Sequence, residues 1–469
     1  MVKKEIRFFL IIVFFFSISS AVSQKTVVKG YIKGAEGRFL RAYTYTDYLT
    51  YNLKKFGEQK INNNASFEFV FNVNAPRLIY LRLDFFETTL YIEKGKTYEL
   101  IFEDYDVFSY RETSNPFLER PLLNYSIKGE DSTSLNYLIR TFDSRYNAFI
   151  ADNAVALLRG RDRALIESFK EETAHYFSTA THPYFHIYKT YKIAIIEQSS
   201  RILSRENLFR AYFYNKPVHV DNMGYMVFFN QYFSKFFTDI SRRIRFSDLE
   251  YTINDLASYP ALLDSLGKDT LLRNEYIRKV VLVKGLGELW EYPGFERSNI
   301  ISILDDVAHK ARFPEVRIMA TAQKELLNSY KGHFPIENFT LTDTRGALLN
   351  LKDWKGKYVY LFFWNTSCVR CMAEMPLLNE IYEKFSNHVK IVGVNVDMEP
   401  LNMNYFLSDK DYNFTIAHFD YNYGLLDNLR VRHLPFFILI DRDGQVLRYP
   451  APQPSGAITT TLNRLINQP

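Results

Sequence analysis

The two cysteines of this 469-residue chain lie three positions apart, and their surroundings constrain the local fold more than any other feature. Cys368 and Cys371 follow the apolar run 358–364 and precede the helix-like segment 372–382. This order predicts a strand, a short turn and a helix that begins at the cysteines. A helix N-terminus carries about half a positive charge and unpaired N–H groups, so it stabilises a thiolate. We therefore expect a reactive dithiol in which Cys371 resolves a mixed disulfide formed by Cys368.

Two other interpretations of a CxxC pair fit this sequence less well. Zinc needs four ligands, and the chain has no second CxxC and no suitable spacing among His388, His418 and His433. A purely structural disulfide would close a very short loop, which restricts the unfolded chain little and so stabilises little. The sequence therefore favours redox chemistry, and it predicts no metal and no cofactor.

The first 23 residues have the pattern of a secretory signal peptide. Basic residues within 1–7 precede an apolar core over 8–18, and the small residues Ala21 and Ser23 end the segment. The apolar core is shorter than the roughly 20 residues that a membrane span needs. We therefore expect cleavage before Gln24, a mature chain without a transmembrane span, and a location in the periplasm or cell envelope.

The length suggests about three domains, and the pattern of the sequence changes accordingly. Short apolar or alternating runs separated by turn residues predict an antiparallel β-sandwich over 24–125. Apolar residues at three- and four-residue steps predict an all-α region over 126–332, with its many aromatic residues in the core. The charge clusters there are typical of solvated faces, and a net charge of +5 over this length does not predict nucleic-acid binding.

The last unit, 333–469, alternates strand-like and helix-like segments. A hairpin around 338–351 precedes the strand 358–364 and the CxxC helix. A buried parallel strand is expected at 389–396, and 434–440 is expected as a further strand. This alternation predicts an α/β sheet with helices on both faces.

Residues from about 333 to 469 resemble the TlpA/ResA-type envelope disulfide reductases, which implies a thioredoxin fold. The matching motifs are ordered along the chain: Phe363-Trp364 before the CxxC pair, Glu374-Met-Pro376 after it, Gly393-Val-Asn-Val-Asp397, and Leu434-Pro435 before the turn Asp441-Arg-Asp-Gly444. The whole chain is similar in architecture to multidomain thioredoxin-like proteins exported by some Gram-negative bacteria.

The resemblance implies a role for each matching residue. Cys368 is the exposed nucleophile, and Cys371 is the resolving thiol. Pro435 corresponds to a cis-proline that faces the active site, where the backbone of Leu434 would pair with an extended substrate. Glu374 matches an acidic residue near the buried cysteine and is a candidate to carry the proton of Cys371; the alternative makes it an exposed carboxylate that complements the helix dipole.

Trp364 and Arg370, which flank the reactive cysteine, are assigned to the substrate-binding surface. The sequence departs from the family at neighbouring positions. Ser367 replaces a tryptophan that usually precedes the first cysteine, and Phe362 stands where thioredoxin has a buried aspartate. Arg370 should favour the thiolate through its charge, and a stabilised reduced form makes a dithiol more oxidising. The direction of electron flow is therefore left open.

The expected function is an exported thiol–disulfide oxidoreductase that reduces or exchanges disulfides in envelope proteins, with electrons from a membrane dithiol donor. Two alternatives belong to other classes. One is a non-enzymatic envelope interaction protein that uses the thioredoxin fold as a scaffold. The other is a peroxiredoxin-like peroxidase, which Asn365 disfavours because that class has threonine three positions before the reactive cysteine.

Overall fold

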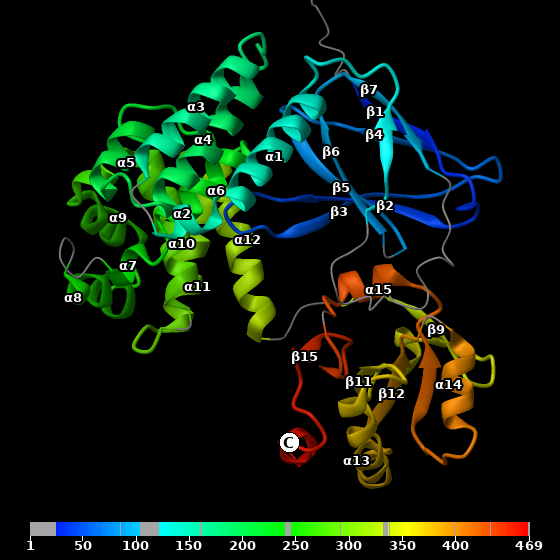
Figure 1. Ribbon diagram of the computed structural model, residues 1–469. Helices are drawn as coiled ribbons and strands as arrows, with labels where there is room; N and C mark the ends of the chain where they lie inside the picture. The colour runs from blue at the N-terminus through cyan, green and yellow to red at the C-terminus, as the bar shows by residue number, and fades with distance from the viewer. Residues whose placement is uncertain are drawn as a thin grey trace, which may run out of the picture.

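The computed structural model describes residues 25–84, 86–103, 122–159, 162–239, 245–290, 292–331, 336, 338–397, 399–431 and 433–467. The predicted order of a β-sandwich, a helical middle and a C-terminal α/β unit is confirmed (Figure 1). The predicted signal segment 1–23 lies outside the described residues. None of the helices in the described ranges combines the length and the apolar character that a membrane crossing requires.

The N-terminal unit consists of two four-stranded sheets with the strand orders β4-β1-β7-β8 and β3-β2-β5-β6. Their bounds are β1 Thr26–Tyr31, β2 Phe39–Tyr45, β3 Leu53–Lys60, β4 Ser66–Phe71, β5 Arg77–Leu83, β6 Phe86–Ile92, β7 Thr97–Phe102 and β8 Tyr125–Ile127. Strand β4 buries Phe67, Phe69 and Phe71 and exposes the residues between them, as strand alternation requires.

Two details of the sandwich differ from the prediction. Strand β1 pairs with β7 in parallel, so the sandwich is not wholly antiparallel. These strands are not consecutive in the chain, and no short hairpin fixes their relative direction. The predicted division after residue 125 also cuts through β8, whose three residues pair with β7. The sandwich therefore extends to Ile127.

The described elements of the middle unit are all helices, and they lie between Leu135 and Lys331. Its elements are α1 Leu135–Asp152, α2 Ala154–Arg159, α3 Arg163–Tyr176, α4 Pro183–Ser199, α5 Arg205–Tyr212, α6 Met223–Tyr232, α7 Phe236–Asp239, α8 Phe246–Glu250, η2 Tyr251–Asp255, α9 Tyr259–Gly267, η3 Thr270–Leu272, α10 Glu275–Leu289, α11 Arg297–Lys310 and α12 Pro314–Lys331. Many of its aromatic residues lie in the core, where Phe142, Tyr225 and Phe228 are fully buried, although a few tyrosines such as Tyr214 are exposed.

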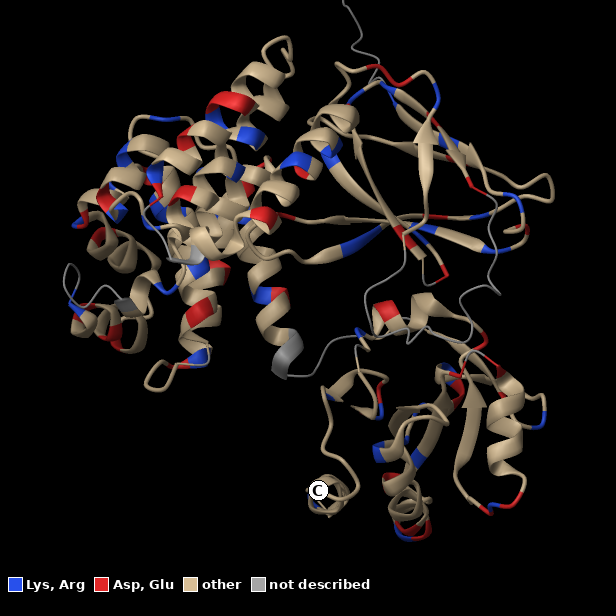
Figure 2. Cartoon of the chain, in the orientation of Figure 1, with Lys and Arg blue, Asp and Glu red and all other residues tan. Residues whose placement is uncertain are grey.

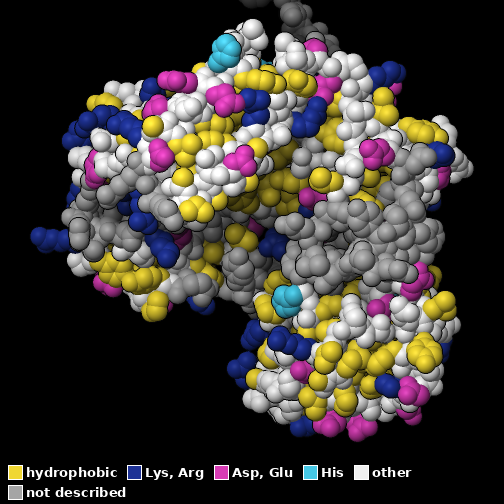
Figure 3. Space-filling model, viewed as in Figure 1, with side chains coloured by type: hydrophobic (Ala, Val, Ile, Leu, Met, Phe, Trp, Pro, Cys, Tyr) yellow, Lys and Arg dark blue, Asp and Glu magenta, His cyan; other side chains and the backbone are white. Residues whose placement is uncertain are grey.

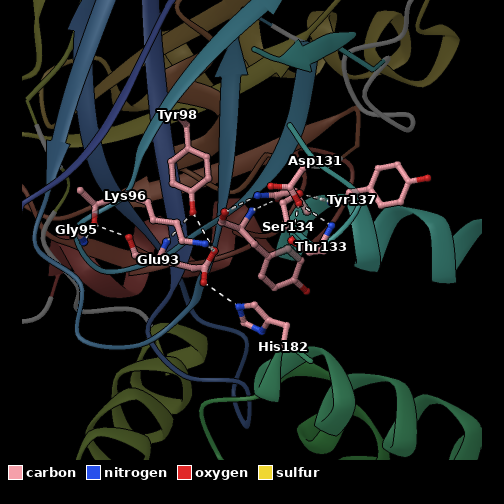
Figure 4. A network of polar contacts seen from close by, with 12 residues as sticks. Glu93, Gly95, Lys96, Tyr98, Asp131, Thr133, Ser134, Tyr137 and His182 are labelled. Carbon is pink, nitrogen blue, oxygen red and sulfur yellow. Dashed lines mark hydrogen bonds and ion pairs between the residues drawn. The ribbon is translucent and has the colours of Figure 1, made fainter. Parts of the chain in front are cut away.

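A polar network joins the sandwich to the helical unit (Figure 4). His182 precedes α4, and its Nε2 lies 2.8 Å from Oε1 of Glu93. Lys96 donates to the other carboxylate oxygen over 2.7 Å. Burial raises the pKa of Glu93, but the hydrogen bonds from His182 and Lys96 outweigh it and the net shift is downward. A charged carboxylate therefore ties the loop after β6 to the start of α4.

The C-terminal unit is a seven-stranded sheet with the order β10-β9-β13-β12-β11-β14-β15. Its elements are β9 Thr340–Asp343, β10 Leu348–Asn350, η4 Leu351–Trp354, β11 Tyr358–Trp364, α13 Val369–Phe385, β12 Val389–Asn395, α14 Pro400–Leu407, β13 Thr415–His418, α15 Tyr423–Asn428, β14 Phe436–Ile440, β15 Val446–Arg448 and α16 Ile458–Asn467. Strand β11 is parallel to β12 and antiparallel to β14.

Alternation along β11 divides the interior of this unit into two layers. Tyr360, Phe362 and Trp364 belong to the core that contains residues of α13 and α16. Leu361 and Phe363 belong to the core on the other face, which contains residues of α15. Because both faces of β11 are covered, the strand is an unbroken apolar run in the sequence. The helix that carries the cysteine pair and helix α15 therefore lie on opposite faces of the sheet.

Helix α15 packs against the sandwich. A row of charged side chains crosses one face of the sandwich sheet, because Glu58, Arg41, Arg82 and Glu87 stand directly opposite one another on adjacent strands. Arg82 Nη1 lies 3.1 Å from an oxygen of Asp427 in α15. The apolar core of the sandwich also continues into the α15 side of the C-terminal sheet. The sandwich consequently covers the α15 face and leaves α13 on the far side of the sheet (Figure 1).

The surface is hollowed between the helical unit and the C-terminal unit on the face that Figure 3 shows. A cavity of about 970 Å³ lies where the three units meet, and its walls include Arg41 of β2, Glu325 of α12 and Arg430 after α15. Several of its charged groups form ion pairs: Arg41 Nε lies 2.6 Å from Glu58, and Lys54 Nζ lies 3.5 Å from Glu325. The cavity is therefore a polar junction between units.

Candidate active site

The cysteine pair lies at the start of α13, as the sequence predicts. Cys368 is the N-cap residue of the helix, and its Sγ accepts a hydrogen bond from the backbone N of Cys371 over 3.1 Å. The two side chains form a disulfide. Cys371 is fully buried, whereas Cys368 is half-buried. In the reduced protein the same N–H group and the helix N-terminus would stabilise a thiolate at Cys368.

The residues next to Cys368 determine what a partner protein would meet. Val369 is 82% exposed, and Ser367 and Arg370 are also exposed. Arg370 therefore lies where the sequence interpretation requires it, on the accessible side of the pair. Its contact with a substrate stays a prediction.

Trp364 does not lie on this surface, so its assignment to substrate binding is wrong for this structure. Its side chain is fully buried. Its ring packs 5.6 Å from that of Phe406 and 6.4 Å from that of Phe362, measured between centroids. The cause is its position in β11, where it faces the same interior layer as Phe362. Trp364 therefore belongs to the core that also contains Cys371 and Met375 of the cysteine helix.

The peptide bond between Leu434 and Pro435 is cis, as the sequence predicts. Pro435 is buried immediately before β14, and Leu434 is half-buried. Because Phe436 pairs with Phe363 across the sheet, Pro435 lies level with the end of β11, near the start of α13. The pairing of the Leu434 backbone with a substrate strand stays a prediction.

Glu374 is buried on α13 and is only 7% exposed. Its carboxylate accepts hydrogen bonds from Ser455, over 2.9 Å from the backbone N and 2.6 Å from Oγ. Burial raises the pKa of nearby Tyr360, and the charge of Glu374 raises it further. The alternative of an exposed carboxylate that serves only the helix dipole is therefore wrong. The proton-carrying role of Glu374 towards Cys371 stays a prediction.

A second buried carboxylate, Asp397, was not predicted to have a role. It follows β12, is 7% exposed, and accepts hydrogen bonds from Thr366 in the loop before Cys368. The sequence holds one signal for it: an acidic residue directly after a buried parallel strand, whose end meets the same sheet edge as the CxxC turn. Within the described ranges no group of three or more His, Cys, Asp or Glu residues is arranged to hold a metal.

The different environments of the two thiols predict the order in which they are alkylated. Reduced protein treated with iodoacetamide near neutral pH should be labelled at Cys368 first, because that residue is accessible and accepts an N–H bond, while Cys371 is fully buried. Peptide mass mapping over a time course measures the two rates. Equal rates in the native protein would contradict the proposed division of roles.

The C-terminal unit, which carries the cysteine pair, is similar in sequence to known thiol-disulfide oxidoreductases. The redoxin family profile matches residues 331–461. The thiol-disulfide oxidoreductase ResA of Bacillus thuringiensis subsp. konkukian (strain 97-27) is 35% identical over 130 residues, which are 25% of this chain and 75% of that protein. ResA of Bacillus subtilis (strain 168) is 38% identical over 112 residues, 24% of this chain and 62% of that protein.

Among solved structures, the chain is similar to the thioredoxin domain of a thiol-disulfide oxidoreductase from Bacteroides vulgatus. The sequence identity is 23% and the TM-score is 0.27, with 29% of this chain and 98% of that chain covered.

Proposed function

Because the chain belongs, through residues 331–461, to the redoxin family of thioredoxin-like thiol-disulfide oxidoreductases, we propose that it is exported and reduces or exchanges disulfides of envelope proteins. The observation that carries the chemistry is the placement of Cys368, half-buried at a helix N-terminus, beside a fully buried Cys371. The observation that supports export is the basic, apolar and small-residue pattern of residues 1–23.

The proposed reaction transfers two electrons to the substrate. The Cys368 thiolate attacks one sulfur of a substrate disulfide, a mixed disulfide forms, and the other substrate sulfur leaves as a thiolate. Cys371 then loses its proton and attacks the Cys368 sulfur, which releases the second substrate thiolate and leaves the intramolecular disulfide. We propose that Glu374 accepts the proton that Cys371 loses. A membrane dithiol donor would return the pair to the reduced state.

The accessible surface beside the pair supports a protein substrate over a highly charged ligand. Val369 is an exposed apolar residue, and the exposed Arg370 follows it in the chain. Basic and acidic residues are interspersed over the described parts of all three units, without a large region of one sign (Figure 2). Such a surface suits an extended polypeptide segment whose backbone can bond beside Leu434.

Export predicts the N-terminus of the mature protein. Protein purified from the cell-envelope fraction should have the mass of a chain that begins at Gln24, because residues 1–23 would be removed on translocation. Intact-mass spectrometry measures this directly. A retained Met1, or recovery only from the cytoplasmic fraction, would contradict the proposed export.

Trapping of partners tests the proposed substrate class. The variant Cys371→Ser, produced with its own N-terminus, should accumulate as mixed disulfides with envelope proteins, because Cys368 can attack but no second thiol can release the partner. Non-reducing gels and mass spectrometry identify the adducts. The matched control, Cys368→Ser with Cys371→Ser, should form none. Adducts with cytoplasmic proteins alone, or no adducts at all, would contradict an envelope substrate.

A further inference from the structure

The carboxylate of Asp397 is the meeting point of three hydrogen-bond donors. The backbone N of Thr366 lies 3.2 and 3.1 Å from its two oxygens, and Thr366 Oγ1 donates over 3.0 Å. Asn395 Nδ2 donates over 2.8 Å to Oδ2. Asp397 is only 7% exposed, Asn395 is fully buried and Thr366 is half-buried, so water has little access to the carboxylate and to the Asn395 donor. The Asp397 carboxylate accepts a hydrogen bond from each of these three donors.

Thr366 belongs to the short loop that connects β11 to the cysteine helix. In the same loop, the carbonyl oxygen of Asn365 accepts a hydrogen bond from the backbone N of Cys368 over 3.2 Å. One turn later, Cys371 N donates to Cys368 Sγ. Hydrogen bonds that hold Thr366 therefore also fix the loop that directs Cys368 Sγ towards the backbone N–H of Cys371.

Asp397 is itself fixed by two neighbouring strands. Asn395 Oδ1, at the end of β12, accepts a hydrogen bond from the backbone N of Asp397 over 3.1 Å. His418 Nδ1 accepts from the backbone N of Asp420 over 3.0 Å, which leaves the ring proton on Nε2. Nε2 then donates to the carbonyl oxygen of Asp397 over 2.8 Å. The carboxylate is thus a rigid anchor at the sheet edge.

We propose that Asp397 is a positioning residue for the thiol–disulfide reaction, which holds the 365–367 loop so that Cys368 Sγ stays against the Cys371 amide. The chemistry requires a carboxylate here. An asparagine would offer one acceptor oxygen to three converging donors, and its own NH₂ group would face at least one of them. A buried donor left without an acceptor is destabilising, so the loop would shift.

The variants Asp397→Asn and Thr366→Val test the proposal. Both should raise the midpoint pH of Cys368 alkylation in the reduced protein and slow the reaction at pH 7 about tenfold, which corresponds to about one pKa unit. Thr366→Val keeps the charge of Asp397 and removes one hydrogen bond. A shift in the same direction in both variants therefore identifies positioning.

Asp343→Asn is the matched control. Asp343 is also 7% exposed and its Oδ1 also accepts backbone N–H bonds, from Arg345 and Ala347, but in the β9–β10 hairpin. This variant should lower thermal stability and leave the alkylation profile unchanged. The proposal is overturned if Asp397→Asn loses stability with an unchanged profile, which indicates a structural role only. It is also overturned if Asp397→Asn reacts faster at pH 7, which indicates that its charge acts directly on the thiolate. If Asp397→Asn fails to fold, Thr366→Val alone decides.

Discussion

Cys368→Ser should lower the rate of protein-disulfide reduction by roughly 10³-fold or more, because the variant has no thiolate that can open a substrate disulfide. Cys371 remains in this variant but is fully buried in the core beside α13. A buried thiol reaches a protein substrate poorly and is not stabilised as a thiolate. Insulin precipitation in the presence of dithiothreitol measures the loss.

Cys371→Ser provides the matched comparison, since it keeps the attacking thiol and removes the resolving one. It should form a stoichiometric mixed disulfide with a protein substrate and then stop, so that only the first exchange step occurs and no turnover is completed. Retention of more than about a tenth of the parent rate by Cys368→Ser would show that another group attacks the substrate.

Local patterns predict the C-terminal unit well because each element follows from a short stretch of sequence. The apolar run of β11, the cysteine pair at the start of α13 and the proline before β14 are all local signals, and the structure contains them at the predicted places. The parallel pairing of β1 with β7 is a contact between distant segments. No local pattern determines the direction of such a pair.

The site was predicted less completely than the fold, for two physical reasons. The closeness of Trp364 to Cys368 in the sequence predicts a place on the surface, but the alternation of β11 turns its side chain into the core. A strand covered on both faces has no polar positions that would reveal which side chain faces which way. Asp397 was not assigned a role because its donors come from separate segments that only the fold brings together.

The contact between the sandwich and α15 was not predicted either. Arg41 and Arg82 lie on the outward face of a sheet, where charged side chains usually meet solvent. In the folded chain Arg82 is buried instead. Its Nε lies 2.6 Å from Glu87, its Nη1 lies 3.1 Å from Asp427, and its guanidinium lies 4.7 Å from the ring centroid of Tyr43. An outward charge can therefore mark a surface that another domain covers.

Replacement of Arg82 should cause a large loss of stability, the second of the two largest effects that we expect. Burial lowers the pKa of Arg82, but the carboxylates of Asp427 and Glu87 outweigh it and the net shift is upward, so the side chain is a charged group held by two partners. Arg82→Met leaves these two carboxylates near each other without the cation between them. Removal of one member of a buried ion pair typically costs about 3–5 kcal/mol of unfolding free energy. Asp427→Asn should cost less, because Glu87 still pairs with Arg82.

Chemical denaturation followed by circular dichroism measures the loss, and small-angle X-ray scattering below the transition detects separation of the C-terminal unit from the sandwich. Lys128→Met is the control, because Lys128 pairs with Glu99 within the sandwich at 62% and 41% exposure. Such a surface pair contributes only about 0–1 kcal/mol. Equal losses in Arg82→Met and Lys128→Met, with unchanged scattering, would show that the buried pair does not hold the two units together.

The variant Arg82→Met also tests whether the contact between the units affects the reaction at the cysteine pair. The sandwich contacts the α15 face of the C-terminal sheet, whereas the cysteine helix α13 lies on the opposite face. Arg82→Met should therefore retain reduction of a small disulfide, while the orientation of the active site relative to the first two units is lost. If small-disulfide reduction falls together with stability, the docked sandwich also supports the reactive site, and the three units act as one catalytic body.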